Sequence, residues 1–288
     1  MDSGLPRGRS LWRQAWRRLL ANRMAVAGGI VVLVMAGLAL AAPVISPYGY
    51  DQTSGAQFRP PSRLHPMGTD IHGRDLFTRV LYGARLSLGV GFVATAVSLV
   101  IGVGYGAVSG YAGGRIDEAM MRLVDIIYSL PYMFFVIILV AVFGRSVFLL
   151  FFALGAVQWL TVARIVRGQV LAVKEKEFIQ AARAIGAGHA RIIVHHILPN
   201  VLGPVVVYMT LTIPAVILQE AFLSFLGLGV PPPASSWGTL IADGASAVNA
   251  LRIYWWLLLF PGGAMALTLF AMNFLGDGLR DAIDPQLR

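Results

Sequence analysis

Six long stretches without a charged residue constrain the fold of this chain more than any other feature. Each is close to the roughly 20 residues that a helix needs to cross the hydrocarbon core of a bilayer. They lie at or within residues 24–50, 86–114, 126–144, 146–163, 198–219 and 253–276. Only 13% of the residues are charged, about half the share found in soluble domains. The pattern predicts an all-α membrane protein with six transmembrane helices.

The stretches divide the chain into segments. Residues 1–22 are predicted to form a basic amphipathic helix on the membrane surface, and residues 23–47 a first transmembrane anchor. A cleaved signal peptide is the alternative, but the apolar run from Met24 to Ala42 exceeds the about 7 to 15 residues of such a region. The other expected segments are an external loop at 48–83, a five-helix core at 84–276 with a cytoplasmic loop at 164–199 and an external loop at 221–252, and a cytoplasmic tail at 277–288.

Lys and Arg residues are distributed unevenly between the two sides of the membrane. Sixteen fall in segments on the side of the N-terminus and seven fall on the other side. Because cytoplasmic segments carry the excess of Lys and Arg, this distribution predicts that both termini are cytoplasmic. Nucleic-acid binding is not expected, because the basic residues are dispersed and do not form one stripe. The chain has no cysteine, which excludes disulfides and cysteine metal sites.

The cytoplasmic loop at 164–199 contains a short amphipathic pattern. Gly186 and Gly188 follow it and suit a helix end and a turn. A helix outside the bilayer that is apolar on one side must cover that side, either by packing on its own protein or by binding a partner. The pattern leaves both possibilities open. The predicted apolar face consists of Phe178, Ala181, Ala182 and Ile185.

The same loop resembles the EAA loop of ABC importer permeases. The family pattern is Glu-Ala-Ala, three residues, Gly, nine residues, Ile, one residue, Leu-Pro, and the spacing fits throughout. In that family the loop is a coupling helix that docks on a cytoplasmic ATPase subunit. Gln180 replaces the acidic residue and His196 replaces the Ile, and Glu177, one turn earlier, is the candidate substitute for the missing acid. The resemblance implies a coupling role for Gln180, Ala181, Ala182, Gly186, Leu198 and Pro199.

Further stretches narrow the resemblance to the C-type permease subunit of dipeptide and oligopeptide importers. Together they cover about residues 60 to 285. They are His65-Pro66-Met67-Gly68-Thr69-Asp70 with Gly73-Arg74-Asp75, Tyr82-Gly83-Ala84-Arg85-Leu86-Ser87-Leu88, Gly110-Tyr111-Ala112-Gly113-Gly114, Leu223-Ser224-Phe225-Leu226-Gly227-Leu228-Gly229, and Gly276-Asp277-Gly278-Leu279-Arg280-Asp281.

This resemblance implies a type I ABC importer permease fold in the bacterial cytoplasmic (inner) membrane. It also implies four kinds of partner: a second homologous permease subunit, two ABC ATPase subunits, an extracytoplasmic substrate-binding protein and membrane lipid. ATP and Mg²⁺ would be bound by the ATPase subunits, and this chain would bind no cofactor. Short peptides are the expected cargo, and nickel, glutathione or another small solute is the alternative.

Other functional classes fit the sequence poorly. The two lysines, Lys174 and Lys176, do not lie in a Gly-x-x-x-x-Gly-Lys phosphate loop, so the chain itself is not expected to hydrolyse ATP. A secondary carrier usually has two related halves and coupling-ion sites, and neither is visible. The spans offer no nucleophile with a base, so an enzyme is not expected. His189, His195 and His196 lack the carboxylate or spacing of a metal site.

Several polar or small residues near the span ends are further candidates. Asp70, Arg74 and Asp75 are expected either to form local ion pairs in an external turn or to lie beside the solute path. Asp125 is expected to interact with Arg122 at a helix end, or to act as a cytoplasmic gate. Glu220 is expected either to line the pathway or to be paired internally. Trp237 belongs to the external loop, which is expected to cap the pathway or to contact a delivery protein. A strip predicted to permit close helix packing consists of Gly102, Gly106 and Gly110.

Overall fold

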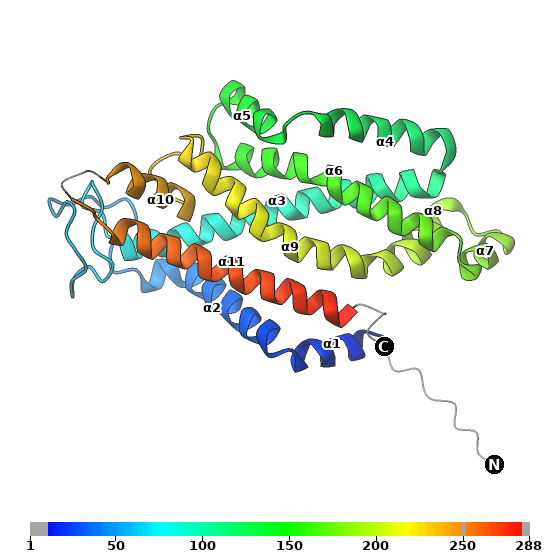
Figure 1. Cartoon of the computed structure of the whole chain (residues 1–288), viewed down its shortest axis with the longest axis horizontal. Coiled ribbons are helices and arrows are strands. Elements are labelled where there is room, and N and C mark those ends of the chain that lie inside the picture. Colours follow the sequence, from blue (N-terminus) through cyan, green and yellow to red (C-terminus); the bar gives the residue numbers. More distant parts are fainter. Residues whose placement is uncertain (1–10, 249–251, 284–288) are drawn as a thin grey trace, which may run out of the picture.

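The structure is a computed structural model, which describes residues 11–248 and 252–283. Apart from one isolated bridge between Thr69 and Asp75, the regular elements in these ranges are helices (Figure 1). They are α1 (Leu11–Ala21), α2 (Arg23–Ile45), α3 (Leu76–Ala112), α4 (Gly114–Ser129), α5 (Tyr132–Phe143), α6 (Val147–Lys174), α7 (Glu177–Ala184), α8 (His189–Ile192), the π-helical turn η1 (Ile193–Ile197), α9 (Leu198–Phe225), α10 (Trp237–Ser246) and α11 (Trp256–Ile283).

Five helical segments are long and apolar enough to cross a membrane: α2, α3, α6, α8 to α9, and α11. A sixth crossing requires α4 and α5 together, and these two helices are bent by 77° at their junction. The expected span at 126–144 is therefore interrupted between Ser129 and Tyr132. Pro131 explains the break, because its ring disfavours helical geometry at the preceding residue, and Leu130 adopts an extended conformation.

The helices also extend beyond the predicted segment boundaries. α3 begins inside the predicted external loop 48–83, α6 covers the first part of the cytoplasmic loop 164–199, α9 enters the external loop 221–252, and α11 enters the tail 277–288. The first span, expected to reach residue 47, ends at Ile45. Charged residues such as Arg79 and Arg167 remain helical in these extensions, where carboxylate partners neutralise them.

Close contact between α3 and α6 forms the centre of the molecule (Figure 1). A Cβ atom added at Gly102 would lie 2.5 Å from Val162 Cβ, and one added at Gly110 would lie 2.9 Å from the carbonyl oxygen of Arg167. At Gly106 the added atom would collide with the Ala163 carbonyl oxygen. The predicted glycine strip is therefore confirmed as the surface that lets the two backbones approach.

The first transmembrane helix packs against the last one. Gly28 of α2 lies against the Ala271 backbone of α11, and Ala25 lies against Gly278. Leu19 of α1 and Ala282 near the end of α11 are buried in one small cluster. The amphipathic helix at the N-terminal end is thereby attached to the same end of the bundle as the last turns of α11.

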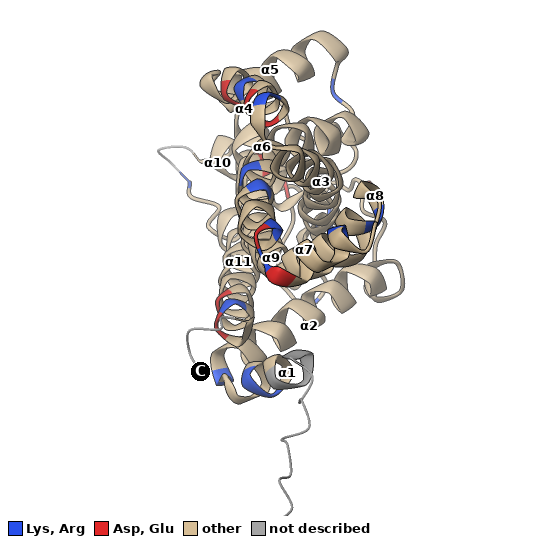
Figure 2. Cartoon of the chain, turned by 90° about the vertical axis from the view of Figure 1, so that its right-hand side faces the viewer, with Lys and Arg blue, Asp and Glu red and all other residues tan. Residues whose placement is uncertain are grey.

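The two ends of the bundle differ in what they carry. The segment between α2 and α3, together with α10, lies at one end of the long axis, and α1, α7 and α8 lie at the other (Figure 1). In the view from that second end, charged residues lie on α1, α4, α7, α8 and α11 (Figure 2). The loop that resembles the EAA loop and the amphipathic helix α1 thus share one end of the molecule.

We predict that Gly106→Ala destabilises the protein, because the added methyl group must separate α3 from α6. Overpacking of this kind is expected to lower the free energy of unfolding by about 1–3 kcal/mol. Gly104→Ala is the matched control, since a Cβ atom at Gly104 has no neighbour within 4 Å. Thermal unfolding of the purified protein in detergent measures both effects, and equal melting temperatures for the two variants would contradict the role of the strip.

Candidate functional site

α7 is a short helix held against α6 and α8, at the end of the bundle that also carries α1 (Figure 1). Ile179 and Ala182 are buried in one cluster with Val173 of α6 and Ile192 of α8. The predicted apolar face is therefore only partly correct, because Ala182 packs inward while the other three members do not. The packing partners shift the buried face by one position, so that Ile179, which the sequence pattern left out, takes the inward place.

The outward side of α7 remains apolar and uncovered by the described part of the chain. Phe178 is 41% exposed and Ile185 is 86% exposed, and Ala181 lies between them. Glu177 is also exposed, and the Gln180 side chain donates a hydrogen bond to the carbonyl oxygen of Glu175 at 3.2 Å. Of the three motif residues on α7, Gln180 and Ala181 are therefore exposed and Ala182 is buried.

Gly186 ends α7 in a left-handed conformation, with φ of 83°. The N–H of Gly186 donates to the Arg183 carbonyl at 3.0 Å, and the N–H of Ala187 donates to the Ala182 carbonyl at 3.0 Å. This pair of bonds is a Schellman motif, which favours glycine at the left-handed position. Gly188 has φ of −65°, which any residue adopts, so only Gly186 has the predicted special conformation.

Tyr111, near the C-terminal end of α3, contacts both α7 and α8. Its hydroxyl lies 2.9 Å from His189 Nδ1, and the guanidinium of Arg183 lies 5.3 Å from the centre of its ring. Leu198 is half-buried beside the same apolar cluster, and Pro199 is exposed in the first turn of α9. Through η1 the unit continues directly into α9, so α7 is joined to α3, α6 and α9 together.

Two ion pairs link α4 to α6. The Arg167 guanidinium donates to both carboxylate oxygens of Asp117 at 2.6 Å, and Ser109 of α3 donates to the same carboxylate. Arg164 donates to Asp125 at 2.7 Å.

The arrangement corrects the expected interaction of Asp125. Arg122, its expected neighbour, lies 3.6 Å from Glu118, and the partner of Asp125 comes from α6. Sequence spacing identified the nearest cation along the helix, whereas helix packing brings Arg164 closer.

At the opposite end, Asp70 is the centre of a buried ion-pair network. Arg74 and Arg79 donate to its carboxylate at 2.7 and 2.6 Å, so the expected local pairing of Asp70 with Arg74 is confirmed. Burial alone would raise the pKa of Asp70, but Arg79 and the backbone and side chain of Arg74 lower it below its usual value. The stabilising effect is therefore present at neutral pH and is lost as the pH falls through this lowered pKa.

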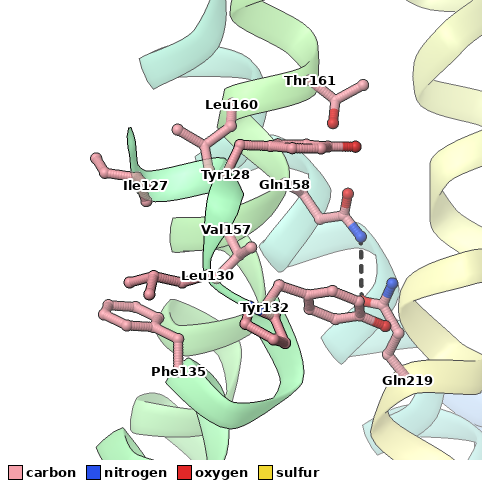
Figure 3. Close-up of a pocket in the computed structure, with 11 residues that line it drawn as sticks. Ile127, Tyr128, Leu130, Tyr132, Phe135, Val157, Gln158, Leu160, Thr161 and Gln219 are labelled. Atoms are coloured by element: carbon pink, nitrogen blue, oxygen red, sulfur yellow. Dashed lines mark hydrogen bonds between the residues drawn. The ribbon is translucent and has the colours of Figure 1, made fainter. Parts of the chain in front are cut away.

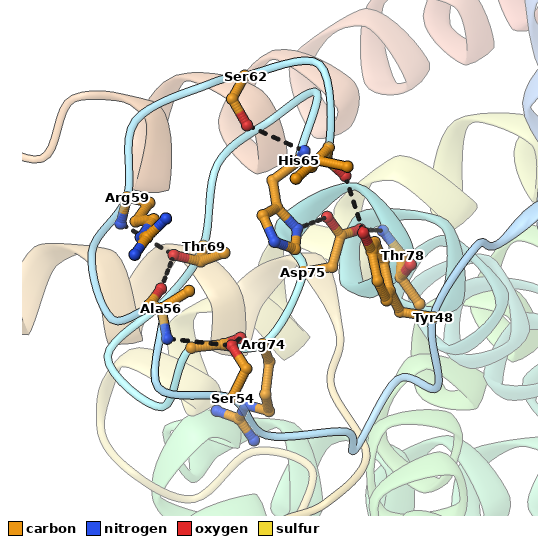
Figure 4. Close-up of polar contacts among 12 residues, drawn as sticks. Tyr48, Ser54, Ala56, Arg59, Ser62, His65, Thr69, Arg74, Asp75 and Thr78 are labelled. Carbon is orange, nitrogen blue, oxygen red and sulfur yellow. Dashed lines mark hydrogen bonds and ion pairs between the residues drawn. The ribbon is translucent and has the colours of Figure 1, made fainter.

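Asp75 has a separate structural role at the start of α3. Its carboxylate accepts a hydrogen bond from the Thr78 N–H at 2.8 Å, which caps the helix, and lies 2.9 Å from His65 Nδ1 (Figure 4). Thr69 and Ser54 hold the neighbouring turns of the same loop (Figure 4). The loop between α2 and α3 is therefore an ordered polar structure.

Glu220 and Trp237 are both internal. Glu220 is fully buried, and its Oε1 accepts hydrogen bonds from Ser224 and Ser236 at 2.7 Å each. Trp237 is also fully buried, with its backbone N–H donating to Ser87 Oγ at 2.9 Å and its indole N–H donating to the Val80 carbonyl at 3.1 Å. The Trp237 indole therefore attaches α10 to α3, and the two expected roles of the surrounding external segment stay predictions.

Sequence reasoning missed Arg79, Tyr111, Asp117 and Arg167, which join helices that are distant along the chain. Their one sequence signal is a charged or phenolic group near the end of an apolar stretch, which does not identify the partner. Across the described ranges, no group of three or more His, Asp or Glu side chains is arranged to hold a metal ion. The three histidines of the loop do not form such a group.

Comparison with known proteins adds independent information. Residues 102–288 match the family described as binding-protein-dependent transport system inner membrane component, and residues 10–66 match the N-terminal transmembrane domain of oligopeptide transport permease C. The oligopeptide transport system permease protein OppC of Escherichia coli K12 is 52% identical over 98% of this chain and 93% of its own length. The dipeptide transport system permease protein DppC of Bacillus subtilis is 47% identical over 97% of this chain and 87% of its own length.

The fold has a counterpart among solved structures. A structure of the MetNI methionine ABC transporter has a TM-score of 0.58 with this chain at 19% identity, and the match covers 71% of this chain and 96% of that one. At this level of identity the similarity concerns the fold alone. It supports the expected architecture of an ABC importer permease.

Proposed function

The chain belongs to the family of binding-protein-dependent transport system inner membrane components, within its oligopeptide and dipeptide permeases, and from this premise we propose that it is a permease subunit of an ATP-driven importer of short peptides. It would enclose the pathway together with a second, homologous permease. An external binding protein would deliver the peptide, and two ATPase subunits would bind ATP and Mg²⁺ at the cytoplasmic side.

The exposed apolar side of α7 is the observation that carries the coupling role. Phe178, Ala181 and Ile185 lie outside the spans on a helix whose other side is firmly packed. Apolar side chains in this position lose contact with water when a partner covers them. A cleft on an ATPase subunit is the occupant we propose, with Glu177 near the position of the missing acidic residue of the motif.

Movement of α7 would reach the spans through its attachments. When ATP binding draws two ATPase subunits together, α7 would move with the subunit on which it is docked. Because α7 is joined to α3 through Tyr111 and continues through η1 into α9, this displacement would tilt the spans as a unit. Such tilting exchanges inward and outward access to the pathway, as in other rigid-body transitions.

We also propose that both termini and α7 lie in the cytoplasm, as the distribution of Lys and Arg favours. In this orientation the loop between α2 and α3 faces the outside. A cysteine introduced at exposed Ile71 is predicted to react with a membrane-impermeant thiol reagent in intact cells, whereas one at Arg183 reacts only after permeabilisation. The chain has no other cysteine. Reaction of both positions from the same side would contradict this orientation.

Two substitutions test the coupling role of α7 in different ways. Gly186→Val forces valine into the left-handed conformation, which introduces strain of about 1 kcal/mol or more. This strain is small compared with a fold stability of about 5–15 kcal/mol. Ile185→Asp leaves the backbone unchanged and places a charge on the exposed apolar side. Both variants are predicted to insert and to pair with the second permease, but to lose ATPase association or peptide uptake.

The readouts are co-purification of the ATPase subunits and ATP-dependent uptake of labelled peptide, measured in the same preparation. Gly188→Val is the control, because Gly188 has an ordinary φ and open space around it. Normal association and uptake in both test variants would show that the loop is a passive connector. Uptake of nickel or glutathione in place of peptide by the native complex would instead assign a different cargo.

A further inference from the structure

A cavity of about 270 Å³ with both polar and apolar lining lies at the bend between α4 and α5, where these helices face α6 and α9 (Figure 3). The extended backbone at Leu130 and Pro131 separates the two helices and leaves space beside α6. The volume is near the lower end of the about 300–1,000 Å³ typical of ligand pockets. The lining residues are Ile127, Tyr128, Leu130, Pro131, Tyr132, Phe135, Val157, Gln158, Leu160, Thr161 and Gln219.

Two glutamines from different helices meet in this cavity. Gln158 Nε2 of α6 donates a hydrogen bond to Gln219 Oε1 of α9 at 3.0 Å. Gln219 also hydrogen-bonds the Tyr132 hydroxyl, whereas Gln158 Oε1 has no hydrogen-bond partner in the described part of the chain. Figure 3 shows the hydroxyl groups of Tyr128, Tyr132 and Thr161 on the same side of the cavity as the two amides.

The position of these groups along the helices indicates membrane depth. Gln158 lies about 17 Å from the start of α6 at Val147, given a rise of 1.5 Å per residue, and the 28-residue helix is about 42 Å long. An amide with unused donors and acceptors is unfavourable when it faces lipid. We therefore expect the open side of the cavity to face a water-filled space or a polar ligand.

The chemistry of the lining indicates which ligand fits. The cavity offers amide and hydroxyl donors and acceptors beside apolar surface from Leu130, Phe135 and Val157, and its lining contains no charged residue. A peptide backbone unit supplies one N–H and one C=O, which these groups match. The nearest charges, Arg164 over the Tyr128 ring at 4.2 Å and its partner Asp125, neutralise each other.

We propose that Gln158 and Gln219, with Tyr132 and Thr161, form a site that hydrogen-bonds the backbone of a peptide during its passage. This inference rests on the proposed function as a peptide permease. Neutral amide contacts bind a backbone independently of its side chains and weakly enough for the peptide to leave, as conduction through a membrane pathway requires. The site would therefore contact many peptides without selecting among them.

The test uses the complete transporter in proteoliposomes, with the binding protein and radiolabelled trialanine. Gln158→Leu and Gln219→Leu are predicted to reduce the rate of uptake about tenfold, the effect of losing about one hydrogen bond in the transit state. ATP hydrolysis stimulated by the binding protein is predicted to persist. Gln169→Leu is the matched control, since this glutamine lies on the same helix and does not line the cavity.

A second measurement does not depend on glutamine packing. In the otherwise cysteine-free chain, Thr161→Cys is predicted to react with a small hydrophilic thiol reagent, and saturating trialanine with binding protein is predicted to slow this reaction. Suppose that the native complex imports trialanine. Normal uptake in both leucine variants, or a reaction rate at Thr161→Cys that peptide does not change, would then overturn the proposed site. Failure of the native complex to import any peptide would overturn the proposed function itself.

Discussion

The close approach of α3 and α6 is the interaction on which the other parts of the structure depend. Three glycines on α3 let its backbone reach the backbone and valine side chains of α6, a contact that a single methyl group would obstruct. At the N-terminal end of α3, Asp70, Asp75 and Trp237 hold the polar loop and α10 in place. At its C-terminal end, Tyr111 contacts α8 and α7. One rigid pair of helices thereby connects the two faces of the molecule.

The bent pair α4 and α5 is attached to this rigid pair in two different ways. Asp117 and Asp125 of α4 bind Arg167 and Arg164 of α6, whereas α5 packs its buried valines on α6 and α3 in an apolar cluster. The cavity lies at the break between α4 and α5, where these helices face α6 and α9. Because α7 packs on α6 and continues through η1 into α9, the proposed tilting of the spans as a unit would carry Gln158 and Gln219 together. ATPase docking would thereby be joined to the proposed peptide site.

The sequence predicted the existence of the spans better than their ends and interior geometry. Runs without charge identify hydrocarbon-crossing segments directly, and the glycine spacing at Gly102, Gly106 and Gly110 predicted the close packing that the structure contains. The helices run past the charge-free stretches because ion pairs across the fold let charged residues such as Arg79 remain helical. Apolar residues continue through Pro131, so the run without charge does not show the 77° bend between α4 and α5. For α7, motif spacing located the loop and the glycine turn, but the buried face depends on Val173 and Ile192, which sequence periodicity does not reveal.

The central claim is that α7 controls access to the cavity, and thiol accessibility under two nucleotide conditions tests it most directly. The chain with Thr161→Cys, assembled with its partners, would be exposed to an impermeant reagent from the outer side, without nucleotide and with ATP trapped in the ATPase subunits. Labelling of this chain can report only the introduced thiol, because the chain has no native cysteine. The account predicts faster labelling in the trapped state and no such increase when Gly186→Val is also present. Equal labelling in the two nucleotide states, or an undiminished increase with Gly186→Val, would contradict it.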